Sequence, residues 1–81
     1  MQVELKNRIF TATQWFKDGD HPAVYYHKER PGLAMYSGFY IDEANEDLPT
    51  KMIPGLWIVE LFDGIHVYGN DVFEELFMEY K

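Results

Sequence analysis

The segment that most constrains the fold is residues 54–80, in which two short apolar runs lead into a helix-like pattern. The runs 56–61 and 65–68 flank Phe62-Asp63-Gly64. Asp-Gly between apolar runs is a strong hairpin signal, because a type I′ turn needs positive φ at both central residues. The sequence therefore predicts an antiparallel hairpin turning at Asp63-Gly64, with Gly64 at positive φ.

An amphipathic helix is predicted directly after this hairpin, up to residue 80. Apolar residues recur at helical period on one face, at Val72, Phe73, Leu76, Phe77 and Tyr80. Acidic residues occupy the opposite face, at Asp71, Glu74, Glu75 and Glu79. Asp71 and Glu74 have the spacing of a capping box, and Asn70 is the alternative cap. Trp57, Phe73 and Phe77 are expected to join the sheet to the helix as core residues.

The rest of the chain is predicted to supply further strands. Residues 8–16, 23–29 and 33–42 are rich in β-branched and aromatic side chains, with Gly38 as a candidate bulge. Residues 17–22 and 43–50 are predicted loops, and residues 30–32 are a predicted turn. The expected class is α+β, with an antiparallel sheet of four to five strands and the C-terminal helix packed on it, in a single domain spanning residues 1–81.

Composition excludes several kinds of site. The chain has no cysteine, which excludes disulfides, thiolate-bound metals and a thiol nucleophile. No apolar run approaches the length of a membrane helix, and residues 1–8 lack the apolar region of a signal peptide. A cytoplasmic location with no membrane partner is therefore expected.

Charge is divided unevenly along the chain. Residues 1–30 carry five Lys or Arg against four acids, for a net +1, whereas residues 31–81 carry two against ten, for a net −8. Direct binding to nucleic acid requires clustered cations, so the net charge of −7 disfavours it. The same charge favours a basic protein partner.

No catalytic or metal site is predicted. The candidate metal ligands are Asp18, Asp20, His21, His27 and His66, and they lack the spacing of a calcium loop or a histidine pair. Asp18 and Asp20 are better explained as turn formers. Ser37 lacks the turn that presents a nucleophilic serine, and an enzyme using His66 is the least favoured interpretation. No catalytic residue, metal or cofactor is therefore assigned, and a non-enzyme is expected.

Seven aromatic residues lie between positions 15 and 40. They are Trp15, Phe16, Tyr25, Tyr26, Tyr36, Phe39 and Tyr40. A base-stacking platform needs a basic groove beside its rings, and only Lys28 and Arg30 lie near in sequence. Core packing is therefore the preferred explanation for these rings.

Eight acidic residues are the candidate partner-binding set. Asp42, Glu43, Glu46 and Asp47 lie in one loop, and Asp71, Glu74, Glu75 and Glu79 lie on the predicted helix. Helical residues four apart rise about 6 Å, so Asp71, Glu75 and Glu79 would form a line of negative charge that mimics nucleic-acid phosphates. The alternative is a solvated face that keeps a small protein soluble.

The order of short motifs resembles small accessory proteins encoded by bacteriophages. The matching elements are Ala12-Thr13-Gln14-Trp15, Gly19-Asp20-His21-Pro22, Pro54-Gly55-Leu56-Trp57-Ile58-Val59, Gly64, and Asp71 through Phe73 to Tyr80. Leu56 departs from the pattern, which has Asp before the Trp. The resemblance implies a phage or prophage origin, and small acidic phage proteins often bind and block a host enzyme or defence complex.

Two functions follow as expectations. The first is a non-enzymatic, anti-defence inhibitor that binds a host or defence protein with a basic surface, through the acidic residues. The alternative is a small phage structural or assembly module that works as a homodimer, for which an unpaired edge strand would be the mark.

Overall fold

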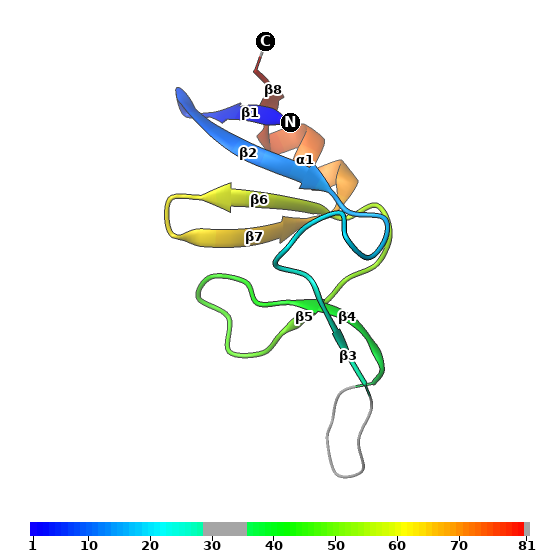
Figure 1. Cartoon of the computed structure of the whole chain (residues 1–81). Helices are drawn as coiled ribbons and strands as arrows, with labels where there is room; N and C mark the ends of the chain where they lie inside the picture. Colours follow the sequence, from blue (N-terminus) through cyan, green and yellow to red (C-terminus); the bar gives the residue numbers. More distant parts are fainter. Residues whose placement is uncertain (29–35, 81) are drawn as a thin grey trace.

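The computed structural model describes residues 1–28 and 36–80. In chain order these residues form β1 (Gln2–Leu5), β2 (Arg8–Gln14), β3 (Tyr25–His27), β4 (Gly38–Ile41), β5 (Thr50–Lys51), β6 (Trp57–Leu61), β7 (Gly64–Tyr68), α1 (Asn70–Leu76) and β8 (Met78–Glu79) (Figure 1). The predicted α+β class is confirmed, because antiparallel sheets dominate and a short C-terminal helix packs against them. The predicted turn at residues 30–32 and the start of the predicted strand 33–42 lie outside the described residues.

The described strands form two antiparallel sheets. The larger sheet has five strands in the order β7-β6-β2-β1-β8, and the smaller has three in the order β3-β4-β5. The five predicted strands are divided between the two sheets, rather than forming one. Three of them correspond to β2, β6 and β7 of the larger sheet, which also contains β1 and β8, and the other two correspond to β3 and β4 of the smaller sheet. Gly38 pairs with His27 in a regular register that continues to Tyr40, so the predicted bulge at Gly38 is absent.

The first hairpin, β1–β2, is not among the predicted elements. Leu5 pairs with Arg8, so Lys6 and Asn7 are the two turn residues. Their φ angles are 51° and 65°. Positive φ at both central positions is what a type I′ turn requires, and asparagine tolerates it better than most residues.

The predicted β6–β7 hairpin is confirmed, but its turn is shifted by one residue. Leu61 pairs with Gly64, so the central residues are Phe62 and Asp63 rather than Asp63 and Gly64. Gly64 has the predicted positive φ, at 126°, whereas neither central residue does. The turn is therefore not type I′.

Helix α1 is shorter than predicted. It begins after Gly69, which caps it with no side-chain hydrogen bond, and it ends where Phe77 becomes extended. The chain then continues as β8, which pairs with β1, and the Tyr80 amide donates to the Gln2 carbonyl at 3.0 Å. A tertiary strand pairing therefore stops the helix four residues before its apolar pattern ends.

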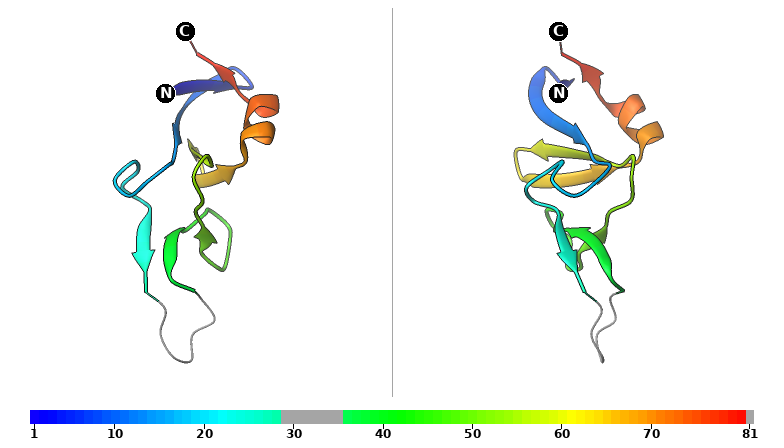
Figure 2. Two further views of the ribbon diagram at one scale, coloured as in Figure 1. Left: turned by 90° about the vertical axis from the view of Figure 1, so that its right-hand side faces the viewer. Right: turned by 45° about the vertical axis from the view of Figure 1, so that its right-hand side comes forward.

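The larger sheet is covered on both faces in the region of β6. On one face, buried Phe73 and Phe77 from the helical segment pack on Val3, Ala12 and Val59. On the opposite face, a second cluster joins this sheet to the smaller one, through Trp15, Val24, Ile41, Met52 and Ile58. The neighbours Ile58 and Val59 are both 0% exposed, although they point to opposite faces. Figure 2 shows α1 beside the larger sheet and the smaller sheet displaced toward the other end of the molecule.

The prediction that the aromatic residues between positions 15 and 40 pack in the core is correct for only some of them. Trp15 and Tyr40 are buried, and Phe39 is half-buried against Trp15. The rings of Phe16, Tyr25, Tyr26 and Tyr36 are exposed. Tyr25 and Tyr26 lie on β3 at an edge of the smaller sheet, and Phe16 and Tyr36 lie outside the strands of both sheets.

Candidate protein-interaction surface

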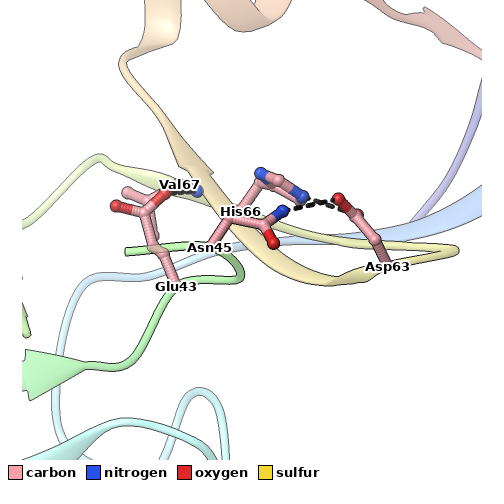
Figure 3. Close-up of polar contacts among 5 residues, drawn as sticks. All are labelled: Glu43, Asn45, Asp63, His66 and Val67. Atoms are coloured by element: carbon pink, nitrogen blue, oxygen red, sulfur yellow. Dashed lines mark hydrogen bonds and ion pairs between the residues drawn. The ribbon is translucent and has the colours of Figure 1, made fainter. Parts of the chain in front are cut away.

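The acidic loop after β4 is fixed to the larger sheet by Glu43, which points inward. Its Oε1 accepts a hydrogen bond from the Val67 backbone N–H at 2.7 Å, and its Oε2 accepts one from the Thr50 hydroxyl. Figure 3 shows the carboxylate of Glu43 reaching the backbone of β7. Glu43 is half-buried and used in the fold, so it is not available to a partner as predicted.

Glu43, Ala44 and Asn45 together form a segment that we term the clip, which runs along the open side of β7. The Ala44 N–H donates to the Ile65 carbonyl at 2.8 Å, and the Asn45 Nδ2 donates to Asp63 Oδ2 at 3.1 Å (Figure 3). The Ala44 bond and the Glu43 bond to the Val67 N–H occupy backbone groups of β7 that an edge strand otherwise leaves unpaired. The loop therefore closes one edge of the larger sheet.

Asp63 also contacts His66 beside the clip. The His66 Nε2 lies 2.7 Å from Asp63 Oδ1 (Figure 3). The hydrogen bond from His66 is the largest cause of a lowered pKa at the Asp63 carboxyl, and charge attraction to His66 and the Asn45 bond act in the same direction. His66 on β7 is thus positioned by its contact with the turn residue Asp63, and its ring also stacks on Tyr68, with centroids 6.4 Å apart.

The remaining acidic residues of the loop face solvent. Asp42 Oδ1 accepts a hydrogen bond from the Tyr25 hydroxyl at 3.3 Å, and the pKa of Tyr25 is raised by desolvation first and by Asp42 second. Glu46 and Asp47 are exposed beside Leu48, which is 79% exposed. Three of the four predicted loop carboxylates are therefore accessible.

The acidic residues after β7 do not form the predicted line. Asp71 and Glu75 lie on α1, four residues apart, but Glu79 belongs to β8. The predicted capping box is also absent, because Glu74 Oε1 accepts from the Asn70 side chain at 3.3 Å and Asn70 Oδ1 accepts from the Trp57 indole at 3.0 Å. The regular spacing that would mimic phosphates is thus lost after Glu75.

Two residues of the apolar face that is predicted to pack on the sheet are on the surface of α1. Val72 is 48% exposed and Leu76 is 45% exposed, whereas Phe73 and Phe77 are buried. With 3.6 residues per turn, the row Val72–Leu76 lies beside the outward row Asp71–Glu75. The prediction failed here because a seven-residue helix on a twisted sheet buries only one i, i+4 pair.

The exposed residues between Asp71 and Tyr80 form what we term the C-terminal surface. It comprises the exposed side chains of Asp71, Val72, Glu74, Glu75, Leu76, Met78, Glu79 and Tyr80. Within the described chain, no Lys or Arg lies within 4.0 Å of its carboxylates. The acidic loop lies at the β7 edge, away from this surface (Figure 1), so the structure separates the two predicted acidic sets.

The candidate metal ligands do not converge. Across residues 1–28 and 36–80, no three His, Asp or Glu side chains are arranged to hold a metal ion. Asp20 Oδ2 accepts from the backbone N–H groups of Phe16 and Lys17, as expected for a turn former. His21 is buried, and its Nδ1 accepts from the Ala23 N–H at 3.0 Å.

Comparisons with models of known protein families, with curated proteins and with solved structures found no match. Among the described helical residues, nothing has the length and apolar character of a bilayer-spanning helix. Geometry and charge are therefore the basis for inferring function.

Proposed function

We propose that this protein is a non-enzymatic binding protein that contacts a basic partner protein through the C-terminal surface. The observation that carries this proposal is the pairing of an acidic row with an exposed apolar row on α1. A few well-buried side chains supply most of the binding energy at protein interfaces, and charges around them steer and select the partner. The C-terminal surface offers both within two turns of helix and one short strand.

The class of partner is proposed from the resemblance to phage accessory proteins. A host or defence protein that handles nucleic acid has the basic surface that this charge would complement. Inhibition would then follow from occupying that surface. Close mimicry of nucleic-acid phosphates is not part of this proposal, because α1 presents only Asp71 and Glu75 in a line.

The test compares two triple variants that remove the same charge. The first changes Glu74, Glu75 and Glu79 to Gln, and the second changes Asp18 to Asn, Glu46 to Gln and Asp47 to Asn. Wild type and both variants are immobilised, exposed to nuclease-treated bacterial lysate, and bound proteins are quantified by mass spectrometry. A partner released by the first triple and retained by the second supports the proposal.

The partner identified in this way is then purified, and its binding to the wild-type protein is measured by titration calorimetry. We expect one-to-one stoichiometry and an affinity that weakens with salt, because the Debye length falls from about 10 Å at 0.1 M to about 3 Å at 1 M. Competition by DNA or RNA would identify the partner's nucleic-acid site as the contact. Binding that persists in the first triple variant and at high salt would contradict the proposal. It would indicate that the acidic residues only keep the protein soluble.

A homodimeric assembly module is the second candidate, because β8 lies at the other edge of the larger sheet. The edge is only two residues long and carries Glu79, and short charged edges discourage pairing with another strand. We therefore rank this candidate below partner binding. A molar mass of one chain by light scattering would exclude it, whereas twice that mass would favour it.

A further inference from the structure

An open hollow lies between the β1–β2 turn and the β6–β7 turn. It is lined by Leu5, Lys6, Arg8, Phe10 and Phe62, and its volume is about 460 Å³. Small-molecule sites commonly occupy about 300–1,000 Å³ and are mostly apolar with a few polar groups. The hollow matches this description in both size and lining.

The apolar lining is a consequence of the short helix. Leu5, Arg8 and Phe10 lie on the same face of the sheet as Val3 and Ala12, because side chains of a strand alternate and paired residues share a face. Helix α1 covers that face near Val3 and Ala12. Figure 1 shows both turns at the end of the sheet away from α1, so this end of the apolar face has no helix over it.

Phe62 is the most exposed ring of the lining. Its side chain is 81% exposed in the turn between β6 and β7. A turn position commonly holds a small polar residue. Phe62 and Phe10 both line the hollow, so two aromatic rings are available to a planar group.

Two cations, Lys6 and Arg8, belong to the lining of the hollow. Lys6 and Arg8 are exposed, and across the described residues no carboxylate lies within 4.0 Å of either. A guanidinium fork binds carboxylate, phosphate or sulfonate groups with two parallel hydrogen bonds. The net charge of the chain is −7, but these two cations make the surroundings of the hollow locally positive.

We propose that this hollow binds a small aromatic anion. The ring of the ligand would lie between Phe10 and Phe62, and its anionic group would contact Lys6 and Arg8. Aromatic groups pack favourably on phenyl rings, and a nearby apolar wall strengthens the charged contact by excluding water. This site uses different residues from the C-terminal surface and is independent of it.

The test uses two fluorescent probes with the same ring system. Anilinonaphthalene sulfonate carries one negative charge, and phenylnaphthylamine is its neutral analogue. Each is titrated with the folded protein at low salt, and the melting temperature is measured with and without probe. We expect the sulfonate to bind more tightly than the neutral analogue and to raise the melting temperature, since a ligand of the native state stabilises it.

Matched variants locate the probe. The double change Lys6→Asn and Arg8→Gln removes both cations and keeps a residue that tolerates positive φ at position 6. Its control, Lys17→Gln with Lys28→Gln, removes two exposed cations elsewhere. Phe62→Ser removes the exposed ring, and Phe16→Ser is its control at another exposed phenylalanine.

The expected result is a dissociation constant for the sulfonate about tenfold weaker in the double variant and in Phe62→Ser, with both controls unchanged. The neutral analogue should lose affinity only in Phe62→Ser. Equal loss in the controls, equal binding of the two probes, or fluorescence without a rise in melting temperature would overturn the proposal, because each indicates non-specific binding or binding to unfolded chains.

Discussion

The indole ring of Trp57 stacks on the phenyl ring of Phe73, with centroids 4.0 Å apart and planes inclined by 5°. Trp57 begins β6 and Phe73 lies in the middle of α1, so this pair joins the larger sheet to the helix. The Trp57 indole N–H also donates to Asn70, which begins the same helix. Phe73 in turn stacks on Phe77, with centroids 5.2 Å apart. The helix is therefore positioned by a continuous run of three rings.

Loss of the central ring of this run should unfold much of the protein. Phe73→Ala removes a buried side chain and leaves a cavity, with an expected loss of about 3–5 kcal/mol in the free energy of unfolding. Phe62→Ala is the control, because the same atoms are removed from an exposed ring and changes of that kind cost about 0.5 kcal/mol or less. Urea unfolding followed by circular dichroism measures both. Equal stability of the two variants would contradict the packing described here.

Gly64 is predicted to be intolerant of any side chain. Gly64→Val should reduce the free energy of unfolding by more than about 1 kcal/mol, because φ of 126° is unfavourable for a β-branched residue. A Cβ at this position would also lie 3.1 Å from the Cβ of Ala44, within the clip. Gly69→Ala is the control, since φ there is −66° and no atom lies within 4 Å of the added Cβ. An unchanged melting temperature for Gly64→Val would exclude this geometry.

The carboxylate of Glu43 is predicted to stabilise the fold rather than bind a partner. Glu43→Gln replaces one of the two accepting oxygens with a donor and removes the negative charge. The Val67 N–H and the Thr50 hydroxyl, which can turn to accept from the amide, then keep only weaker, neutral hydrogen bonds. We expect a loss of about 1–3 kcal/mol and faster hydrogen exchange at the Val67 amide. Glu46→Gln, three residues later and exposed, should change neither. Partner binding lost in Glu43→Gln without any loss of stability would refute this assignment.

The lowered pKa of Asp63 predicts how ionisation of this residue affects the stability of the fold at low pH. In the folded chain the pKa lies below its ordinary value of 3.8, so ionisation of Asp63 favours folding. This contribution is complete above pH 3.8 and is lost as the pH falls through the folded-state pKa. Titration of the Asp63 carboxyl carbon by NMR should show the pKa rising toward its ordinary value in His66→Phe. Asn45→Ala should raise it less, because the His66 hydrogen bond is the larger cause. Identical pKa values in wild type and His66→Phe would rule out the His66 contact in solution.

Local sequence was sufficient for elements whose turn and strands are adjacent. The β6–β7 hairpin follows from two apolar runs and a glycine, since the pairing residues are only a few positions apart. The missed β1–β2 hairpin had a comparable signal in Asn7, which suits positive φ. The buried positions of Phe73 and Phe77 also followed from the sequence pattern, whereas the helix is capped by Gly69 rather than by Asp71 or Asn70.

The end of the helix was decided by contacts far along the chain. The apolar period continues to Tyr80, but the backbone groups of β1 need partners on their outer side, and β8 provides them. Pairing with β1 requires extended backbone, so the helix ends at Leu76 and Glu79 leaves the acidic row. No pattern within residues 70–80 carries this information, because the partner strand lies at the other end of the sequence.

The sequence by itself determined the α+β class, the hairpin, the buried pair on the helix and the uneven distribution of charge. Only the tertiary structure decided which charged and apolar groups reach solvent. Composition assigned Glu43 to the surface, but its carboxylate is used to close the edge of β7. Apolar periodicity assigned Val72 and Leu76 to the core, but the helix contacts the sheet through one row only. Phe62 is far from Lys6 and Arg8 in sequence, and the three residues line one hollow because two turns lie at the same end of one sheet. Exposure depends on which segments pack together, and that packing is set by the whole chain at once.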